Sequence, residues 1–425
     1  MAGQVRQRWS PTPGSGLPRR DREGCEYEAY LPDPLSDRVF QLRGDVAADV
    51  ADAESAIQRL NLEATALANS EGLARLLLRA EAVASSKIEG LEIGGRRLLR
   101  AEMARVLGDD VGDVTAEEIL GNVNAMAWTV TDLAAVDRIE VDHLREIHRR
   151  LLAGTRLEDE AGRVRDRQNW IGGSDYNPCR AEFVPPPPSE VPPLLNDLCA
   201  FCNQDNLPAV AQAAVAHAQF ETIHPFADGN GRTGRALIQV ILRRRGLAPR
   251  IVPPVSLVLA TWSSDYVQAL SDTRYLGDPD SPQARDGANR WIALFAAASR
   301  RAVDDARLYE GRVRDLQARW QRKLGRIRRG SSADLLMEAL PGTPILTVAT
   351  AATLIGRSFQ AANQAVRQLT EAGVLRQIRV GRRNRAFEAS ELIEAFNDLE
   401  RRLASPRGDT QMAAPSRPVP RWPRD

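Results

Sequence analysis

Apolar residues recur at helical spacing through most of this 425-residue chain. Long stretches place apolar side chains three or four positions apart and fill the remaining positions with good helix formers. Ser70 and Thr115 stand where helix N-caps are expected, and Gly90 stands where a helix should end. The predicted helices cover residues 45–67, 70–90, 115–134, 140–155, 189–204, 208–223, 230–246, 261–272 and 287–329. No alternation of strands and helices is evident, so the pattern predicts a mainly α-helical fold.

The pattern changes after residue 330. Short helices are predicted at 333–340, 347–356 and 358–373, and two strands follow around a turn at 381–384. Three helices and a hairpin in this order indicate a winged helix-turn-helix domain.

The predicted hairpin is strongly basic. It carries five arginines and no acid between residues 376 and 385. Such a wing could contact DNA phosphates, and a solvated hairpin used for dimerisation or target docking is equally consistent with it. The arginines are Arg376, Arg379, Arg382, Arg383 and Arg385. Side chains of the preceding helix that could contact bases are Gln360, Asn363, Gln364 and Arg367.

Composition is that of an ordinary globular protein, with 43% hydrophobic and 27% charged residues. The formal net charge is +1, so the molecule as a whole has no field that would attract nucleic acid or a membrane.

The termini and the cysteines bear on the compartment. Residues 1–24 and 404–425 are rich in Pro, Gly and Arg and are predicted to be disordered. Neither a signal peptide nor an apolar run of about 18 residues occurs, so no transmembrane helix is predicted. The four cysteines are too few and too scattered for a disulfide framework, and Cys199 and Cys202 are predicted to be buried thiols. These features predict a cytoplasmic protein.

The stretch HPFADGNGRTGR at residues 224–235 has unusual chemistry for a helix or a simple loop. His224 follows an apolar helix, and a neutral imidazole is the usual general base for a hydroxyl group. Asp228 supplies a hard oxygen ligand that suits Mg²⁺ shared with phosphates. A base and a metal ligand therefore stand four residues apart.

The second half of the stretch is suited to an anion. Gly229, Asn230 and Gly231 can expose successive backbone N–H groups at the start of a helix, where the helix dipole also favours negative charge. Arg232 and Arg235 lie three positions apart, so both guanidinium groups can reach phosphate oxygens. The spacing is not that of a Walker P-loop. We therefore predict a nucleotide-phosphate site.

The same stretch resembles the signature of the Fic family, HPFx[DE]GNGRxxR, and matches it at every fixed position. Flanking segments at 26–35, 162–173 and 181–191 also resemble the family, so the likeness covers residues 27–308. It implies a Fic-type helical bundle with a small β-hairpin flap, preceded by a helical N-terminal domain.

The resemblance implies adenylylation, in which AMP passes from ATP to a hydroxyl side chain of a target protein and pyrophosphate leaves. His224 would deprotonate the hydroxyl and Asp228 would hold Mg²⁺ on the α- and β-phosphates. Arg232 would bind the β-phosphate and Arg235 the γ-phosphate. The ATP-binding positions implied in this way are Gly229, Asn230, Gly231, Arg232, Thr233, Gly234, Arg235 and Tyr266. Tyr266 would contact adenine, although a half-buried aromatic residue on an amphipathic helix fits it almost as well.

A second stretch, SSKIEG at 85–90, resembles the inhibitory motif of the family. Ser85 and Glu89 share a helix face, and Glu89 would pair with Arg235 and so block the γ-phosphate. The alternative is an ordinary exposed glutamate near a helix end.

The resemblance also implies a flap at Glu182, Phe183 and Val184 that docks the target by strand pairing. The implied partners are ATP and a hydroxyl-bearing target protein, which could be the chain itself. DNA at the winged helix and a homodimer are further candidates, and no membrane contact is expected.

Three alternatives share the same site: removal of AMP from a modified protein, transfer of another phosphate-containing group, and a DNA-binding regulator with a vestigial site.

The predicted organisation follows from these motifs. The predicted segments are a disordered N-terminus (1–24), an N-terminal helical domain with the inhibitory motif (25–110), a Fic catalytic domain (111–308), a basic helical linker (309–330), a winged helix-turn-helix domain (331–403) and a disordered tail (404–425).

Overall fold

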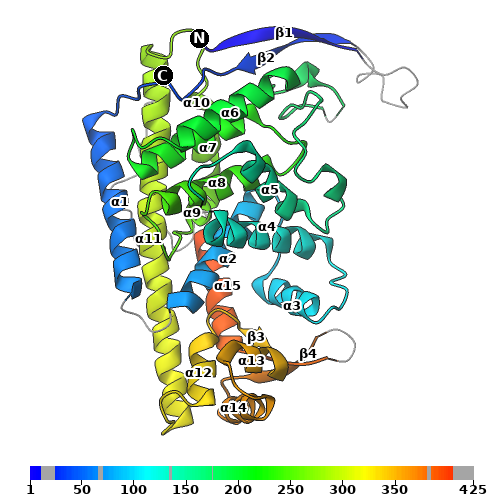
Figure 1. Ribbon diagram of the computed structural model, residues 1–425, viewed down its shortest axis with the longest axis vertical. Helices are drawn as coiled ribbons and strands as arrows, with labels where there is room; N and C mark the ends of the chain where they lie inside the picture. Colours follow the sequence, from blue (N-terminus) through cyan, green and yellow to red (C-terminus); the bar gives the residue numbers. More distant parts are fainter. Residues whose placement is uncertain (11–23, 66–69, 134–135, 175, 381–383, 405–425) are drawn as a thin grey trace.

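The computed structural model describes residues 1–10, 24–65, 70–133, 136–174, 176–380 and 384–404 (Figure 1). Within these residues the fold is mainly α-helical, as predicted, with two small sheets. Every helix predicted before residue 330 is present, and α3 and α9 are additional short helices. The bounds are α1 Gly44–Thr65, α2 Ser70–Ile88, α3 Gly95–Val106, α4 Val114–Thr131, α5 Val141–Leu152, α6 Val191–Cys202, α7 Ala209–Ile223, α8 Asn230–Arg244, α9 Val255–Thr261, α10 Ser263–Asp272 and α11 Pro282–Leu324.

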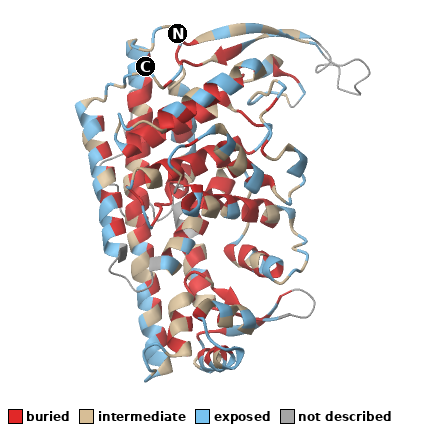
Figure 2. Cartoon of the chain, in the orientation of Figure 1, coloured by how far each residue is buried: buried red, intermediate tan, exposed pale blue. Residues whose placement is uncertain are grey.

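Helix α7 lies at the centre of the bundle. It is rich in alanine and almost all of its side chains are buried, so neighbouring helices can approach its backbone closely. The indole N–H of Trp291 on α11 donates to the carbonyl of Ala214 on α7 at 2.6 Å. Figure 2 shows that buried residues concentrate in α7 and α8. The candidate site therefore starts from the most rigid part of the molecule.

Helix α11 connects the bundle to the C-terminal part of the chain. It runs for 43 residues without interruption, which corresponds to about 64 Å at the usual helical rise. Ser281 caps its first turn and Pro282 occupies the first helical position. The predicted helical linker at 309–330 lies largely within this continuous helix, and the domain boundary at 308/309 stays a prediction. Among the described helices, none is long and apolar enough to cross a membrane.

An antiparallel ribbon forms the N-terminal end of the molecule. Strand β1 (Gly3–Trp9) pairs with β2 (Cys25–Leu31), from Gly3 opposite Leu31 to Trp9 opposite Cys25. The prediction of disorder is therefore wrong for Gly3–Trp9. Pairing with a strand later in the chain orders this segment, although its composition alone does not favour a folded structure. Residues 11–23 lie outside the described residues.

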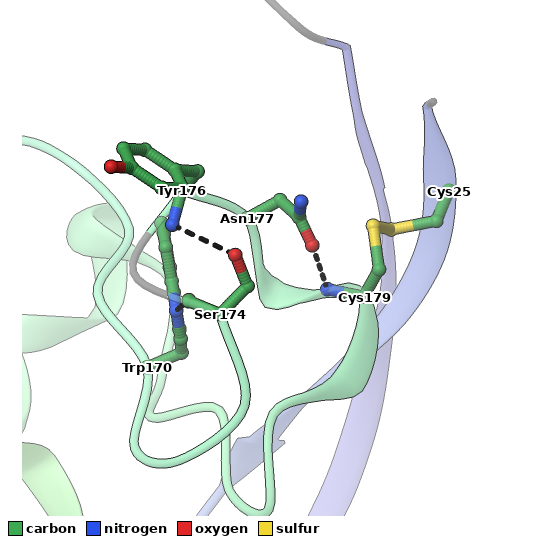
Figure 3. Close-up of a disulfide and its surroundings, with 6 residues drawn as sticks. All are labelled: Cys25, Trp170, Ser174, Tyr176, Asn177 and Cys179. Carbon is green, nitrogen blue, oxygen red and sulfur yellow. Dashed lines mark hydrogen bonds between the residues drawn. A yellow bond between two sulfur atoms is a disulfide. The ribbon is translucent and has the colours of Figure 1, made fainter. Parts of the chain in front are cut away.

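The ribbon is attached to the bundle by a disulfide. Cys25 at the start of β2 is bonded to Cys179, 154 residues later in the chain (Figure 3). The prediction of no disulfide is wrong, because only the folded chain brings these two cysteines together. Cys199 and Cys202 are buried free thiols on α6, as predicted. A cytoplasmic location, which rested partly on the cysteines, stays a prediction.

The C-terminal part contains three helices, a small sheet and a final helix. Its order of elements agrees with the predicted helices and hairpin, and adds β3 and α15; the identification as a winged helix-turn-helix stays a prediction. The sheet is antiparallel, in the order β3-β5-β4. Arg382, Arg383 and residues 405–425 lie outside the described residues. The elements are α12 Ser332–Ala339, β3 Ile345–Leu346, α13 Val348–Ile355, α14 Phe359–Glu371, β4 Arg376–Val380, β5 Asn384–Glu388 and α15 Ser390–Ala404.

One face of this sheet packs against α3, which follows the segment that carries Glu89. Apolar side chains of α3, the sheet and α15 form a small core of their own. Beside it the fully buried carboxylate of Glu388 lies 3.7 Å from Arg96 and 3.7 Å from Arg100, and it also pairs with Arg376. Arg96 and Arg100 therefore connect α3 to the C-terminal sheet through Glu388, and Arg376 is engaged with the same carboxylate from within the sheet.

Candidate active site

His224 follows α7 in a conformation that is unusual for its residue type. It has φ 48° and ψ 61°, and among the described residues it is the one non-glycine residue with positive φ. Such backbone strain persists only where the surroundings hold it. Here the carbonyl of His224 accepts hydrogen bonds from Arg165 Nε at 2.8 Å and from Asn169 Nδ2 at 3.3 Å. The motif histidine is thus held at a fixed reversal of the chain.

The turn from His224 to α8 is closed by the side chain of Asn230. Its Oδ1 accepts from the N–H of Phe226 at 2.8 Å, and its Nδ2 donates to the carbonyl of Phe226 at 2.8 Å. Gly229 caps the helix with φ 73°, a conformation that glycine adopts without strain. The side chain of Asn230 is thus structural, and its predicted contact with phosphate can only involve its backbone.

The first turn of α8 leaves backbone donors available. Helix geometry gives the N–H groups of Asn230, Gly231 and Arg232 no acceptor inside the helix, and no described residue accepts from them. The helix dipole adds partial positive charge at the same place. These free donors are what the anion cradle predicted from the glycines requires, and binding of an anion to this cradle stays a prediction.

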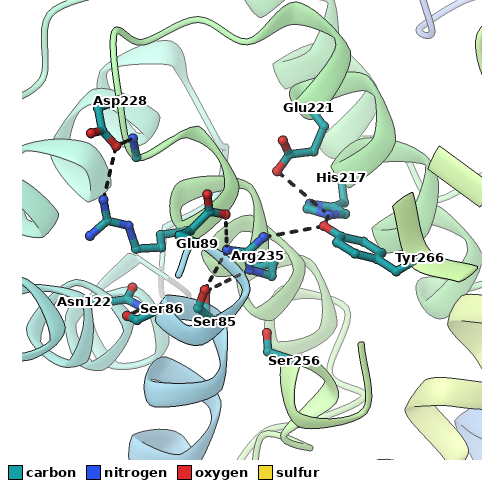
Figure 4. A network of polar contacts seen from close by, with 12 residues as sticks. Ser85, Ser86, Glu89, Asn122, His217, Glu221, Asp228, Arg235, Ser256 and Tyr266 are labelled. Carbon is teal, nitrogen blue, oxygen red and sulfur yellow. Dashed lines mark hydrogen bonds and ion pairs between the residues drawn. The ribbon is translucent and has the colours of Figure 1, made fainter. Parts of the chain in front are cut away.

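Arg235 is buried below the cradle and pairs with the predicted inhibitory residues (Figure 4). Its Nη2 lies 2.6 Å from Glu89 Oε1 and 2.8 Å from the carbonyl oxygen of Ser85. Its Nε donates to Ser85 Oγ at 2.9 Å. The last turn of α2 therefore carries a serine and a glutamate to one arginine, 146 residues beyond Glu89 in the chain.

The carboxylate of Glu89 fills the space directly above Gly231. A Cβ built at Gly231 would lie 1.9 Å from Glu89 Oε1, which no real contact allows. Only glycine at 231 lets the carboxylate come so near the backbone of the first turn. A negatively charged group of this chain thus lies in the anion cradle.

Arg232 differs from Arg235 in having donors to spare. Its side chain is buried, and its Nη2 lies 3.3 Å from Asp228 Oδ1. Its Nε and Nη1 are buried and have no partner among the described residues. Asp228 itself is half exposed. Buried donors without acceptors are rare in proteins, so Arg232 is prepared for an anion that comes from outside.

Charge and burial set the protonation of the two central groups. Burial lowers the pKa of His224 to about 4, and the positive charges of Arg165 and Arg274 act in the same direction. Burial alone would raise the pKa of Glu89, but Arg235 outweighs it and holds the pKa of Glu89 below its usual value. At neutral pH the site therefore contains a neutral imidazole and an ionised carboxylate.

Comparison with known proteins agrees with this geometry. Residues 138–242 match the model of the Fic/DOC family, and residues 47–131 match the model of the N-terminal region of that family. The chain carries a Fic domain. Both the motif 224–235 and the inhibitory segment at Ser85–Glu89 lie inside the matched regions.

Curated relatives of the Fic domain are named adenylyltransferases. Protein adenylyltransferase fic-1 of Caenorhabditis elegans is 31% identical over 166 residues, which are 38% of this chain and 30% of that protein. Protein adenylyltransferase Fic of Drosophila willistoni is 35% identical over 161 residues, 37% of this chain and 30% of that protein. The chain thus spans about a third of the length of these relatives.

Among solved structures, a Fic family protein from Desulfovibrio desulfuricans G20 has a similar fold. Its TM-score is 0.50 at 21% sequence identity, and the match covers 82% of this chain and 97% of that chain. At this identity the likeness concerns the fold alone.

Two residues of the Fic domain support the motif and were not predicted. The Nδ1 of His148 accepts from the N–H of Gly162 at 2.9 Å, so its Nε2 carries the proton and donates to the carbonyl of Asp228 at 2.9 Å. Arg165 contributes further bonds to the carbonyls of Pro186 and Ile223. Neither role has a local sequence signal, because the bonds that support the motif join groups that are distant in the chain.

Three predicted ATP contacts are not placed for that role. Tyr266 is 3% exposed, and its hydroxyl bonds His217 Nε2 at 2.8 Å and lies 3.5 Å from Arg235 Nη1. Gly234 faces α7, where a Cβ would meet His217 and Phe220 at 3.0 Å. Thr233 is wholly buried. All three side-chain positions face the protein interior, and the contacts of Tyr266, Thr233 and Gly234 with the nucleotide stay predictions.

The predicted flap is already paired within the chain. Phe183 and Ile171 exchange hydrogen bonds of 2.8 and 3.2 Å, and the carbonyl of Val184 accepts from the N–H of Tyr30 at 2.9 Å. Glu182 also donates its N–H to Ile171, at 2.9 Å. Strand pairing with a target through Phe183 is therefore not open in this structure. The three flap residues instead line a groove of about 720 Å³ beside the N-terminal ribbon.

Proposed function

We propose that this protein transfers AMP from ATP to a hydroxyl side chain of a protein and that Glu89 inhibits the transfer. The acceptor is a target protein or the chain itself. The site of transfer is the turn from His224 to α8, and the ATP phosphates bind along the first turn of α8. The names of the relatives support the reaction, and the contacts of Glu89 support the inhibition.

The observation that carries the proposal is the position of the Glu89 carboxylate. It pairs with Arg235 at 2.6 Å and lies against Gly231 in the anion cradle. A phosphate oxygen needs the same donors that the carboxylate uses. Glu89 and the γ-phosphate therefore compete for Arg235, and with Glu89 in place the α-phosphate of bound ATP is displaced from His224.

His224 acts as the general base. With a pKa of about 4 its imidazole is neutral at pH 7 and can take the proton of the attacking hydroxyl. The hydroxyl oxygen bonds to the α-phosphorus while the bond to the β-phosphate oxygen breaks, and pyrophosphate leaves. The free donors of Arg232 and the N–H groups of α8 stabilise the charge on the leaving phosphates.

Asp228 is the residue that would hold Mg²⁺. Its carboxylate is half exposed beside the cradle, and one or two carboxylates together with phosphate oxygens form the usual Mg²⁺ site of nucleotide enzymes. No cluster of three or more potential metal ligands exists among the described residues. The ion would neutralise negative charge on the α- and β-phosphates.

Removal of AMP from a modified protein is the second candidate. Glu89 favours it through its position, because the same carboxylate could orient a water molecule towards a phosphate in the cradle. The two reactions place opposite demands on Glu89, which is inhibitory in the first and required in the second.

The test uses ATP labelled either at the α- or at the γ-phosphate, with the wild-type chain and Glu89→Gly. We expect Glu89→Gly to incorporate α-label about a hundredfold faster, because displacement of a reacting group by about 1 Å costs a factor of this order. Glu92→Gly is the matched control, since Glu92 is an exposed carboxylate of the same segment that pairs with Lys87.

Transfer of γ-label, or incorporation by Glu89→Gly no faster than by the control, would contradict the proposal. The second candidate reaction is tested with a protein that already carries labelled AMP. If wild type releases the label and Glu89→Gly does not, Glu89 serves removal.

A further inference from the structure

The C-terminal part contains two helices joined by a tight turn. Helix α13 ends at Ile355, Gly356 follows in the left-handed conformation, and Ser358 caps α14 through a bond to the N–H of Ala361 at 3.3 Å. A three-residue turn with glycine between two helices is the geometry of a helix-turn-helix, whose second helix is the one that reads DNA.

The exposed face of α14 is chemically selective. It contains four side-chain amides and one guanidinium group, and Glu371 at the end of the helix is its one acid. A helix face that serves only solvation usually mixes acids with bases, whereas amides and guanidinium groups form paired hydrogen bonds with adenine and guanine edges. The exposed amide and guanidinium side chains are Gln360, Asn363, Gln364, Arg367 and Gln368, and Phe359 at the start of the helix is exposed as well.

A basic groove runs along one side of α14. Its volume is about 490 Å³, and Arg328, Arg329 and Arg357 line it together with Gln364 and Gln368. No described carboxylate lies within ion-pair distance of any of these three arginines. Glu338 interacts electrostatically with Arg329 at longer range. Three exposed guanidinium groups without a close ion pair, next to an amide-bearing helix, are complementary to a polyanion.

The hairpin lies on the other side of α14. Figure 1 shows α14 at one end of the molecule, with the end of α11 on one side and β4 on the other. Arg379 and Arg385 are directly opposite each other across the β4–β5 ladder and both are exposed. Like charges in such a pair repel, so the pair is stabilised when an anion lies against it.

We infer that α14 binds double-stranded DNA in the major groove, with arginines on both of its sides on the phosphates. The groove arginines Arg328, Arg329 and Arg357 contact one stretch of backbone, and Arg379 and Arg385 contact the other. The amides of α14 face the base edges. The inferred DNA site lies entirely in the C-terminal part of the chain. The inference does not rest on the proposed transferase reaction.

The first test measures the salt dependence of binding. Fluorescence anisotropy follows a labelled short duplex of mixed sequence with the full chain, between about 50 and 200 mM salt. For the triple variant R328A/R329A/R357A we expect weaker binding, and a slope of log K against log salt that is smaller by about 0.9 per lost contact, so by about two to three units. The control R59A/R138A/R250A removes three exposed arginines of the helical bundle and should leave the slope unchanged.

The second test measures base reading. Selection from a randomised duplex library should give wild type a preferred sequence, and N363A/Q364A should lose about tenfold of that preference while keeping the salt slope. Equal binding to heparin and duplex, or an equal loss of slope in the control triple variant, would overturn the inference. AMP incorporation by Glu89→Gly serves as a check on folding, because both sets of C-terminal variants should leave it unchanged.

Discussion

Arg235 and Arg357 present the same guanidinium group under opposite conditions. Arg235 is 1% exposed, and Ser85, Glu89 and Tyr266 together engage its Nε and both of its terminal nitrogens. Arg357 is exposed, and its Nη1 donates to the neighbouring carbonyl of Gly356 at 3.3 Å.

The difference teaches how each end of the molecule can respond to an anion. Around Arg235 an incoming phosphate has to displace a partner that the chain itself supplies, so binding there is a competition and is little affected by salt. Around Arg357 nothing has to be displaced, so binding is immediate, electrostatic and sensitive to salt. One residue type thus has its donors occupied by the chain itself in the first place and accessible to solvent in the second.

The largest expected effect is on AMP incorporation alone. In the Glu89→Gly background, His224→Ala should reduce AMP incorporation by about 10²–10⁴, the usual contribution of a general base. DNA binding at the other end should not change. Incorporation of labelled AMP and duplex anisotropy are measured on the same preparation.

His143→Ala is the control for that variant, because His143 is half-buried on α5, away from the motif, and its side chain accepts the N–H of Glu140. If His224→Ala and His143→Ala transferred AMP at the same rate, His224 would have no place in the mechanism.

A smaller effect is expected when one contact of Arg235 is removed and its pairing with Glu89 is kept. Ser85→Ala removes the acceptor of Arg235 Nε but keeps the backbone carbonyl and Glu89. We expect AMP incorporation to rise about two- to tenfold, the range of one net hydrogen bond. Ser86→Ala is the matched control, since Ser86 Oγ bonds Ala82 and Asn122 instead. A rise of the same size in both variants would mean that α2 is generally destabilised.

The smallest effect concerns pH. The pKa of His224 is lowered to about 4, so its imidazole is already neutral at pH 6 and at pH 8. The transfer rate of Glu89→Gly should therefore be nearly flat between these values and should fall only as pH drops towards 4, where the base becomes protonated. The free energy of unfolding should also decrease as the pH drops from about 6.5 towards 4. The reason is that the histidine of the unfolded chain, with a pKa of about 6.5, is protonated at a higher pH than the histidine of the folded chain. A rate that halves near pH 6.5 would show an unburied His224.

The sequence predicted those parts of the site that are local in the chain. His224, Asp228 and the arginines stand in one turn and one helix, so their spacing alone brings them together. The pairing of Glu89 with Arg235 was predicted from the resemblance of SSKIEG, and its geometry is present at 2.6 Å.

What the sequence missed depends on distant contacts. His148 and Arg165 support the motif through backbone groups that only the fold brings near them. The sequence pattern was compatible with Tyr266 on either the exposed or the buried face of its helix. Tyr266 lies on the buried face, where it packs against Trp291 and His217. The ribbon was missed for the same reason, because the partner of β1 comes after residue 24.

The bond between Cys25 and Cys179 divides the chain into a closed ring and an open remainder. Because 154 residues separate the two cysteines, the cross-link removes chain entropy from the unfolded state worth about 5 kcal/mol. Glu89 is inside this ring, whereas Arg235 is on the open remainder. Reduction would therefore lower the free energy of unfolding by returning this entropy to the unfolded state, and the ring that it opens includes His148 and Arg165, which support the motif, as well as Glu89.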